Sequence, residues 1–129
     1  MKSNALSCVL RVTDAKGRSL LLTGDIEAEQ EHRLVQTDAA ALASSVLMVP
    51  HHGSKTSSSA SFLGAVAPQV AVMQVGYRNR YGHPAPLVLA RYTERGIAVV
   101  RSDTCGAWLW PPDSPAACHR TTARRYWHH

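Results

Sequence analysis

The sequence predicts an α/β domain in which a mixed β-sheet is flanked by helices. Apolar β-favouring segments alternate with helix-favouring segments in the order ββαβαβαββ, which indicates a layered arrangement. The chain has 129 residues, of which 45% are apolar and 18% charged, and this suffices for the core of one ordinary domain. We therefore expect most of the chain to fold around one hydrophobic core.

The first half is expected to open on a β-hairpin. Gly17 lies in a turn signal at a position that favours a positive φ angle. The run Leu20-Leu21-Leu22 is apolar on both faces, so we expect this strand to be central and buried. The expected elements are strands at 7–13 and 19–23, a helix at 26–36 and a short helix at 39–43.

The second half continues the alternation of strands and helices. Pro50 ends an apolar strand, serines at 57–59 offer capping hydroxyls to a helix, and Gly96 ends the last helix. The expected elements are strands at 46–49, 70–75, 97–101 and 107–110, helices at 61–66 and 85–95, and a turn at 102–106 between the last two strands.

Residues 1–112 are predicted to form the domain, and residues 113–129 a basic, flexible tail. Prolines from Pro111 onward break regular structure, and residues 116–129 show no apolar periodicity. We interpret the terminal His128 and His129 as incidental rather than as a metal site.

Positive charge is concentrated in the second half of the chain. Residues 1–50 carry five Lys or Arg against six Asp or Glu, whereas residues 51–129 carry nine against three. Such an excess suits an anionic partner such as nucleic acid or lipid head groups, and it equally suits solubility alone. The longest uncharged stretch, between Thr56 and Arg78, is too polar to span a membrane, and the N-terminus carries no secretory signal.

The three cysteines are widely spaced and contain no C-x-x-C pair. We interpret Cys8 and Cys105 as small strand residues. A disulfide between two of the three, Cys118 included, stays an open alternative.

Polar motifs follow three predicted strands, at the strand ends where α/β proteins gather functional loops. Asp25 comes directly after the Leu22-Thr23-Gly24 run and is a candidate metal ligand, with an N-cap of the next helix as the alternative. His51 and His52 follow the strand that ends at Pro50. On an extended chain they would point in opposite directions, so that one binds metal while the other faces substrate.

The third motif, Asn79-Arg80-Tyr81-Gly82-His83-Pro84, is a polar loop. Turn chemistry alone explains most of it, and His83 is the ambiguous member. A carboxylate and imidazoles from separate strand ends are ligand types that zinc or manganese accepts, and a bridging Asp is typical of two-metal sites. The three motifs together therefore favour a divalent metal site.

These runs resemble the C-terminal metallo-β-lactamase-like domain of ComEC-type DNA-internalisation competence proteins. The matching runs are 19–27, 46–55 and 79–84, in the family's order and spacing, and 102–107 is similar to the family's closing strand pair. The resemblance covers roughly residues 4–110 and implies one half, the C-terminal half, of an αββα sandwich. In the intact domain it implies a nuclease-like hydrolase that uses one or two metal ions, zinc or manganese, to activate water against phosphodiesters of incoming DNA.

The resemblance also implies roles for individual side chains. Asp25 would bind or bridge metal, and His51 or His52 would bind metal or stabilise the transition state. His83 would be a further ligand or a phosphate contact. We predict a metal set of Asp25, His51 and His83, with the histidine pair as catalytic residues.

Substrate contacts are expected from Lys55, Asn79 and Arg80, which lie beside these motifs. For Lys55 and Arg80 a solvated surface position is the alternative. Ser54 is interpreted as a turn or capping hydroxyl rather than a nucleophile, because the sequence places no acid–base partner beside it.

The family's upstream H-x-D/H-x-D-H motif does not occur in these 129 residues. We therefore expect the chain to be inactive alone, and a non-catalytic module that binds DNA or dimerises is the alternative. The expected partners are single-stranded DNA, the remainder of a parent membrane protein and a second copy of the chain. The parent is expected in the bacterial inner membrane, with this part soluble.

Overall fold

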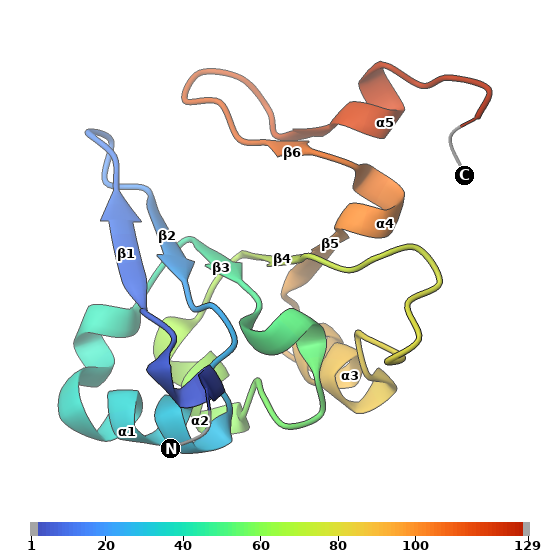
Figure 1. The fold of residues 1–129 in the computed structure, drawn as a ribbon. Helices are drawn as coiled ribbons and strands as arrows, with labels where there is room; N and C mark the ends of the chain where they lie inside the picture. The colour runs from blue at the N-terminus through green and yellow to red at the C-terminus, as the bar shows by residue number, and fades with distance from the viewer. Residues whose placement is uncertain (1–2, 128–129) are drawn as a thin grey trace.

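A five-stranded sheet organises residues 3–127, the part of the chain that the computed structural model describes (Figure 1). The first pair of strands is antiparallel and all later neighbours are parallel, which confirms the predicted mixed α/β sheet. The strands lie side by side in chain order: β1 (Leu10–Thr13), β2 (Ser19–Leu22), β3 (Val46–Met48), β4 (Val70–Met73) and β5 (Ala98–Arg101).

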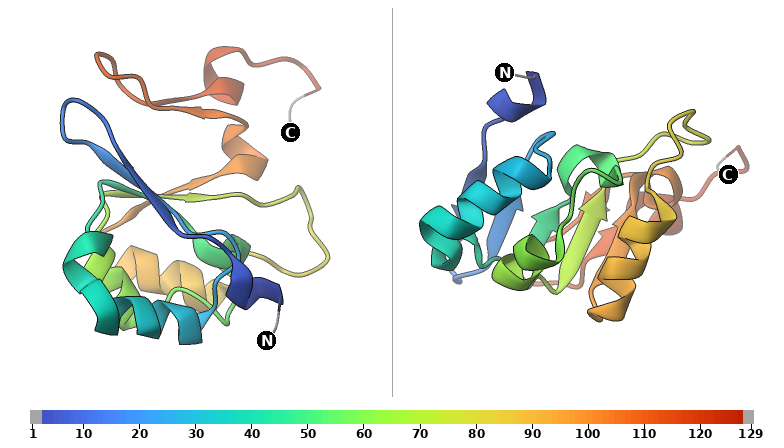
Figure 2. Two further views of the ribbon diagram at one scale, coloured as in Figure 1. Left: turned by 60° about the vertical axis from the view of Figure 1, so that its left-hand side comes forward. Right: turned by 90° about the horizontal axis from the view of Figure 1, so that it is seen from below.

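One helix connects each parallel pair, and all three helices cover the same face of the sheet (Figures 1 and 2). They are α1 (Ala28–Asp38), which continues into the 3₁₀ turn η2 (Ala39–Leu42), α2 (Ala60–Val66) and α3 (Pro86–Glu94). Ser59 caps α2, because its hydroxyl accepts the Phe62 N–H at 3.4 Å. The alternative role of Asp25 as an N-cap is wrong, since α1 begins at Ala28 with Glu27 at the N-cap position.

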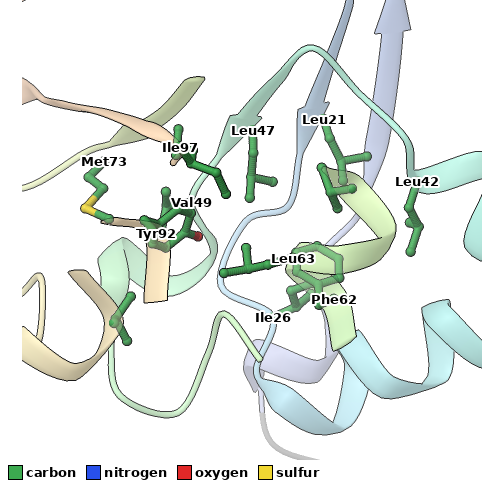
Figure 3. Close-up of a cluster of buried hydrophobic side chains, with 13 residues drawn as sticks. Leu21, Ile26, Leu42, Leu47, Val49, Phe62, Leu63, Met73, Tyr92 and Ile97 are labelled. Atoms are coloured by element: carbon green, nitrogen blue, oxygen red, sulfur yellow. The ribbon is translucent and has the colours of Figure 1, made fainter. Parts of the chain in front are cut away.

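The core lies between the sheet and these helices (Figure 3). Leu21, Leu47 and Ala71 are paired across three strands and are almost fully buried. Helix side chains such as Phe62 and Tyr92 pack against this row and are fully buried as well. Removal of this apolar surface from water stabilises the helix-covered face.

The opposite face of the sheet is only partly covered. The prediction that β2 is buried on both faces is wrong: Leu21 is buried, whereas Leu20 and Leu22 are half-buried. The paired residues on the edge strand β1, Val12 and Leu10, are 48% and 56% exposed. We call this side the open face.

A C-terminal ribbon lies on the open-face side (Figures 1 and 2). It consists of the helical turn α4 (Ser102–Cys105), the short strands β6 (Trp108–Leu109) and β7 (Ala117–Cys118), and the helical turn α5 (His119–Thr122). The strands predicted at 97–101 and 107–110 are present as β5 and β6, but they do not pair with each other, because β5 pairs with β4 and β6 pairs with β7.

A disulfide between Cys105 and Cys118 links α4 to β7 within this ribbon. The prediction of Cys105 as a strand residue is therefore wrong, since it lies in α4, and Cys8 lies just before β1 as an exposed thiol. The expectation that the segment after Pro111 lacks regular structure fails at β7 and α5. This segment is held by polar contacts and a disulfide, which leave no apolar periodicity in the sequence. The predicted role of His128 and His129 concerns residues outside the described part of the chain.

The remaining elements are the 3₁₀ turns η1 (Ser3–Leu6) and η3 (Pro50–Gly53). Within residues 3–127 there is no helix with the length and apolar character needed to cross a lipid bilayer.

Candidate functional site

Three loops meet at the carboxyl ends of β2, β3 and β4. Asp25 follows β2, the two histidines lie in η3 after β3, and the loop 76–84 follows β4. Backbone hydrogen bonds join them: the His51 N–H donates to the Gly24 carbonyl at 3.0 Å, and the Ala85 N–H donates to the Gly53 carbonyl at 2.9 Å. The fold thus brings together motifs that are separated by many residues in the sequence.

Gly53 permits the close approach of the third loop. Its φ angle is +81°, and a Cβ at this position would lie 2.7 Å from the Cβ of Pro84. Any side chain would therefore push the loop 76–84 away from the histidine pair, besides straining the backbone.

The histidine pair does not continue the strand, contrary to the prediction of an extended chain. His51 and His52 have φ angles of 50° and 55°, in the left-handed region that non-glycine residues rarely adopt. Such conformations persist only where surrounding contacts over-determine them, and they cluster at functional sites. The two imidazoles are consequently aimed by a turn rather than by strand alternation.

His52 faces Asp25, and its tautomer follows from its other contact. Its Nδ1 lies 2.7 Å from the Gln74 carbonyl oxygen, which can only accept, so Nδ1 carries the hydrogen. In the neutral ring the lone pair therefore lies on Nε2, 3.5 Å from Asp25 Oδ1. Two lone-pair atoms that face each other at this distance are suited to share a cation or a proton.

His51 has different neighbours. Its Nδ1 lies 3.3 Å from the Thr56 hydroxyl and 3.7 Å from Glu27 Oε1. Glu27 and Thr56 were not among the predicted site residues. Glu27 lies at the end of the first motif run, and this position was the one sequence signal for it. Its local sequence otherwise resembles that of any acidic residue at the start of a helix.

His83 lies beside His51, with ring centroids 5.9 Å apart in an edge-on arrangement. Partial burial lowers the pKa of His83, and the nearby positive charges of protonated His51 and His52 lower it further. His83 is thus biased toward the neutral imidazole, the form that can accept a hydrogen bond or bind a metal ion.

The predicted substrate-binding residues lie around this cluster in different ways. Asn79 braces its own loop, because its amide oxygen accepts the His83 N–H at 2.9 Å and its amide nitrogen donates to the Gly76 and His83 carbonyls. Arg80 is exposed and donates to the Tyr81 hydroxyl at 2.8 Å. Lys55 is exposed on the loop that follows the histidine pair.

A buried carboxylate on α1 holds the segment between the histidine pair and α2. Glu31 on α1 is fully buried and accepts the backbone N–H groups of Ser58 and Ser59 at 2.6 and 2.8 Å. The Ser58 hydroxyl lies 2.8 Å from the Tyr92 hydroxyl, whose pKa burial raises. The sequence suggested only a helix-dipole role for Glu31, since loop backbone partners leave no local signal.

The described side chains do not form a complete metal site. In residues 3–127 there is no group of three His, Cys, Asp or Glu side chains that could hold one ion together. Asp25 and His52 face each other as a pair, while His51 and His83 face one another beside Glu27 and Tyr81. The donor types suit zinc or manganese, but no three of these described side chains lie close enough together to hold one ion.

Comparison with known proteins identifies relatives over most of the chain. It is 48% identical over 104 residues, or 81% of its length, to competence protein ComA of Neisseria gonorrhoeae. It is 40% identical over 103 residues, 80% of its length, to recombination protein 2 of Haemophilus influenzae. It is 38% identical over 90 residues, 70% of its length, to ComE operon protein 3 of Bacillus subtilis.

These matches cover only 15%, 13% and 12% of the three relatives, so the chain corresponds to a small part of each. No protein-family model matches the chain. The identity of 38–48% over 90 to 104 residues nevertheless supports the family that the three motifs indicate. The five-stranded sheet with helices on one face is consistent with half of a sandwich fold. The chain belongs to the ComEC-type competence proteins, of which it represents one domain-sized part.

Proposed function

We propose that the chain is part of the nuclease-like hydrolase domain of a DNA-uptake protein and that its strand-end loops bind the phosphodiester backbone of DNA. The observation that carries this proposal is the presence of two pairs at adjacent strand ends, Asp25 with His52 and His51 with His83. Lys55 and Arg80 are exposed on the neighbouring loops. The relatives named as competence proteins support the assignment to DNA uptake. We place the parent protein in the bacterial cytoplasmic membrane on the same grounds.

The cluster is suited to phosphate in its chemistry. Lys55 and Arg80 are cations in an exposed setting, where they can neutralise phosphate charge. His52 keeps its Nδ1–H on the Gln74 carbonyl, which fixes the ring while Nε2 stays available beside Asp25. Two hollows adjoin His52, of about 230 Å³ beside Asp25 and about 410 Å³ beside His83, and both open to solvent.

Hydrolysis would need ligands from outside residues 3–127, because these residues do not fit a metal ion by themselves. Zinc or manganese would supply an activated water in the intact domain. This chain would contribute Asp25 and imidazoles from the histidine pair and His83 to a ligand set completed elsewhere in the parent. We accordingly expect the chain alone to bind DNA weakly and not to cleave it.

The DNA contact is tested by fluorescence anisotropy with single-stranded DNA at several salt concentrations. We expect weak binding whose affinity falls steeply with salt, and Lys55→Ala and Arg80→Ala variants whose logarithmic salt slopes are each smaller by about 1. Arg33→Ala is the matched control, since Arg33 is an exposed cation on α1 that pairs with Glu29. Binding that is insensitive to salt, or equally weakened by all three substitutions, would contradict the proposal.

A dimerising module is the second candidate, and the open face favours it. Leu10 and Val12 leave an apolar strip on the edge strand β1, where backbone groups are also available for pairing. Light scattering over a range of protein concentrations tests this function. A dimer that Val12→Lys dissociates would support it, and a monomer at every concentration would exclude it.

A further inference from the structure

The loop between β4 and α3 carries two exposed tyrosines, each beside an arginine. Tyr77 is 54% exposed and Tyr81 67% exposed. The Arg78 guanidinium lies 5.3 Å from the Tyr77 ring centroid, and the Arg80 guanidinium lies 4.9 Å from that of Tyr81. Residues 76–84 contain these two cations and no acidic residue.

Both tyrosines lie outside the hydrophobic core. Exposing a large aromatic side chain to water is unfavourable. Asn79 braces the loop backbone through its hydrogen bonds to Gly76 and His83. Both tyrosines nevertheless keep more than half of their surface exposed to solvent, where a ligand can reach them.

Tyr81 also belongs to the hollow beside the histidines. The side chains of His52, Asn79, Tyr81 and His83 line the same hollow of about 410 Å³. The Tyr81 and His83 rings are stacked, with centroids 5.8 Å apart and an interplanar angle of 30°. A flat ligand against Tyr81 would thus lie next to the groups expected to contact phosphate.

We propose that Tyr77 and Tyr81, with Arg78 and Arg80, form a base-stacking platform that makes the site selective for single-stranded DNA. This inference rests on the proposed function, because it assigns a base contact to the site that binds the phosphodiester backbone. Exposed aromatic rings interleaved with arginines bind single strands, whose bases are free to stack, better than duplexes, whose bases are stacked on one another. The two arginines match the charge of the adjacent phosphates.

The test compares three labelled probes of equal length by fluorescence anisotropy: an oligothymidylate, an abasic strand and a duplex. The abasic strand has the phosphates of the first probe and lacks its bases. We expect the wild-type chain to prefer the oligothymidylate to both other probes. Tyr81→Ala should weaken oligothymidylate binding about 10-fold and Tyr77→Ala about 3-fold, as loss of a base–aromatic stack predicts.

Two further variants separate stacking from other effects. Tyr81→Phe keeps the ring and loses only the hydroxyl that Arg80 contacts, so its affinity should stay near that of wild type. Leu6→Ala removes an exposed apolar side chain outside the loop and should leave binding unchanged. Circular dichroism of each variant verifies that it is folded.

The outcomes distinguish failure of the stacking platform from failure of the proposed phosphodiester binding. Equal wild-type affinity for the oligothymidylate and the abasic strand, or no loss of affinity in Tyr81→Ala, would overturn the platform while leaving the phosphate contact intact. Failure of wild type to bind any probe even at low salt would instead overturn the proposed function. Tyr81→Ala should not weaken binding to the abasic strand, and an equal loss on both strands would also contradict stacking.

Discussion

The two faces of the sheet differ in how they are held. On the helix-covered face, side chains such as Phe62, Leu47 and Tyr92 are fully buried in one continuous core. On the open face, Leu10 and Val12 remain about half exposed. The helices thus cover one face of the sheet completely enough to form a core, whereas the open face leaves apolar side chains of β1 exposed to solvent.

The C-terminal ribbon is attached to the open face by contacts of another kind. Arg18 lies 4.3 Å from the Trp110 ring centroid and donates to the Pro111 carbonyl at 3.1 Å, and Lys16 forms an ion pair with Asp113. Exposed contacts of this type contribute little stability each. The comparison teaches that the apolar core lies mainly on the helix-covered face, whereas polar contacts and a shorter apolar row that includes Val46 and Val72 hold the open face.

The largest expected effect separates the two faces directly. Phe62→Ala should lower the free energy of unfolding by about 3–5 kcal/mol, because it leaves a cavity in the core. Leu10→Ala should change it by less than about 1 kcal/mol, since this side chain is already half in water. Urea denaturation of both variants measures the difference, and equal losses would contradict the contrast between the faces.

The next effect concerns the internal cross-link of the ribbon, which joins α4 to β7. Replacement of both Cys105 and Cys118 by serine removes a cross-link between residues 13 positions apart, which is worth about 3 kcal/mol in the chain-entropy treatment. We expect faster amide hydrogen exchange in β6 and β7 and little change in β2 to β4. Cys8→Ser is the matched control, because Cys8 is an exposed free thiol. Unchanged exchange in the ribbon would show that its polar contacts suffice.

A smaller effect is expected where the helix-covered face supports the site. Glu31→Gln replaces a buried carboxylate that accepts two backbone N–H groups and should lower the free energy of unfolding by about 2 kcal/mol. Glu29→Gln, on the exposed side of the same helix, should change it by less than about 0.5 kcal/mol. Thermal unfolding of the two variants checks this, and similar losses in both would argue against a supporting role for Glu31.

The smallest effect is a pH dependence at the strand ends. The pKa of His83 is lower in the folded chain than the ordinary value of 6.5, so the unfolded chain binds more protons as pH falls. The associated stability is fully present above pH 6.5 and is lost as pH falls through the folded pKa. His83→Asn should therefore flatten the pH dependence of the urea midpoint below pH 6.5, and an unchanged slope would contradict this assignment.

Much of the fold on the helix-covered side could be predicted from sequence. Runs such as 46–49 and 70–75 read as strands because burial of both faces makes them uniformly apolar. The strand β6 was predicted, whereas β7 and α5 were missed because a disulfide and polar contacts hold them, and neither leaves a periodic pattern. The three leucines of β2 led to a wrong prediction, since the sequence does not reveal that the open face is covered less at β1 and β2 than at β3 and β4.

The strand-end motifs predicted which side chains lie near one another better than they predicted how these side chains pair. Asp25, His51, His52 and His83 stand out by residue type at strand ends. Their pairing depends on the left-handed turn at η3, which aims His52 rather than His51 at Asp25. Glu27 and Glu31 were indistinguishable from ordinary helix acids, because their partners come from distant loops.

The most direct test of the incomplete site is metal retention combined with DNA cleavage. The chain, with His128 and His129 replaced by alanine, is incubated with zinc or manganese, desalted and subjected to elemental analysis, and its activity on single-stranded DNA is compared with that of Asp25→Ala. The account predicts far less than one metal ion per chain and no cleavage by either protein. Stoichiometric metal together with cleavage that Asp25→Ala abolishes would show that these residues form a complete site.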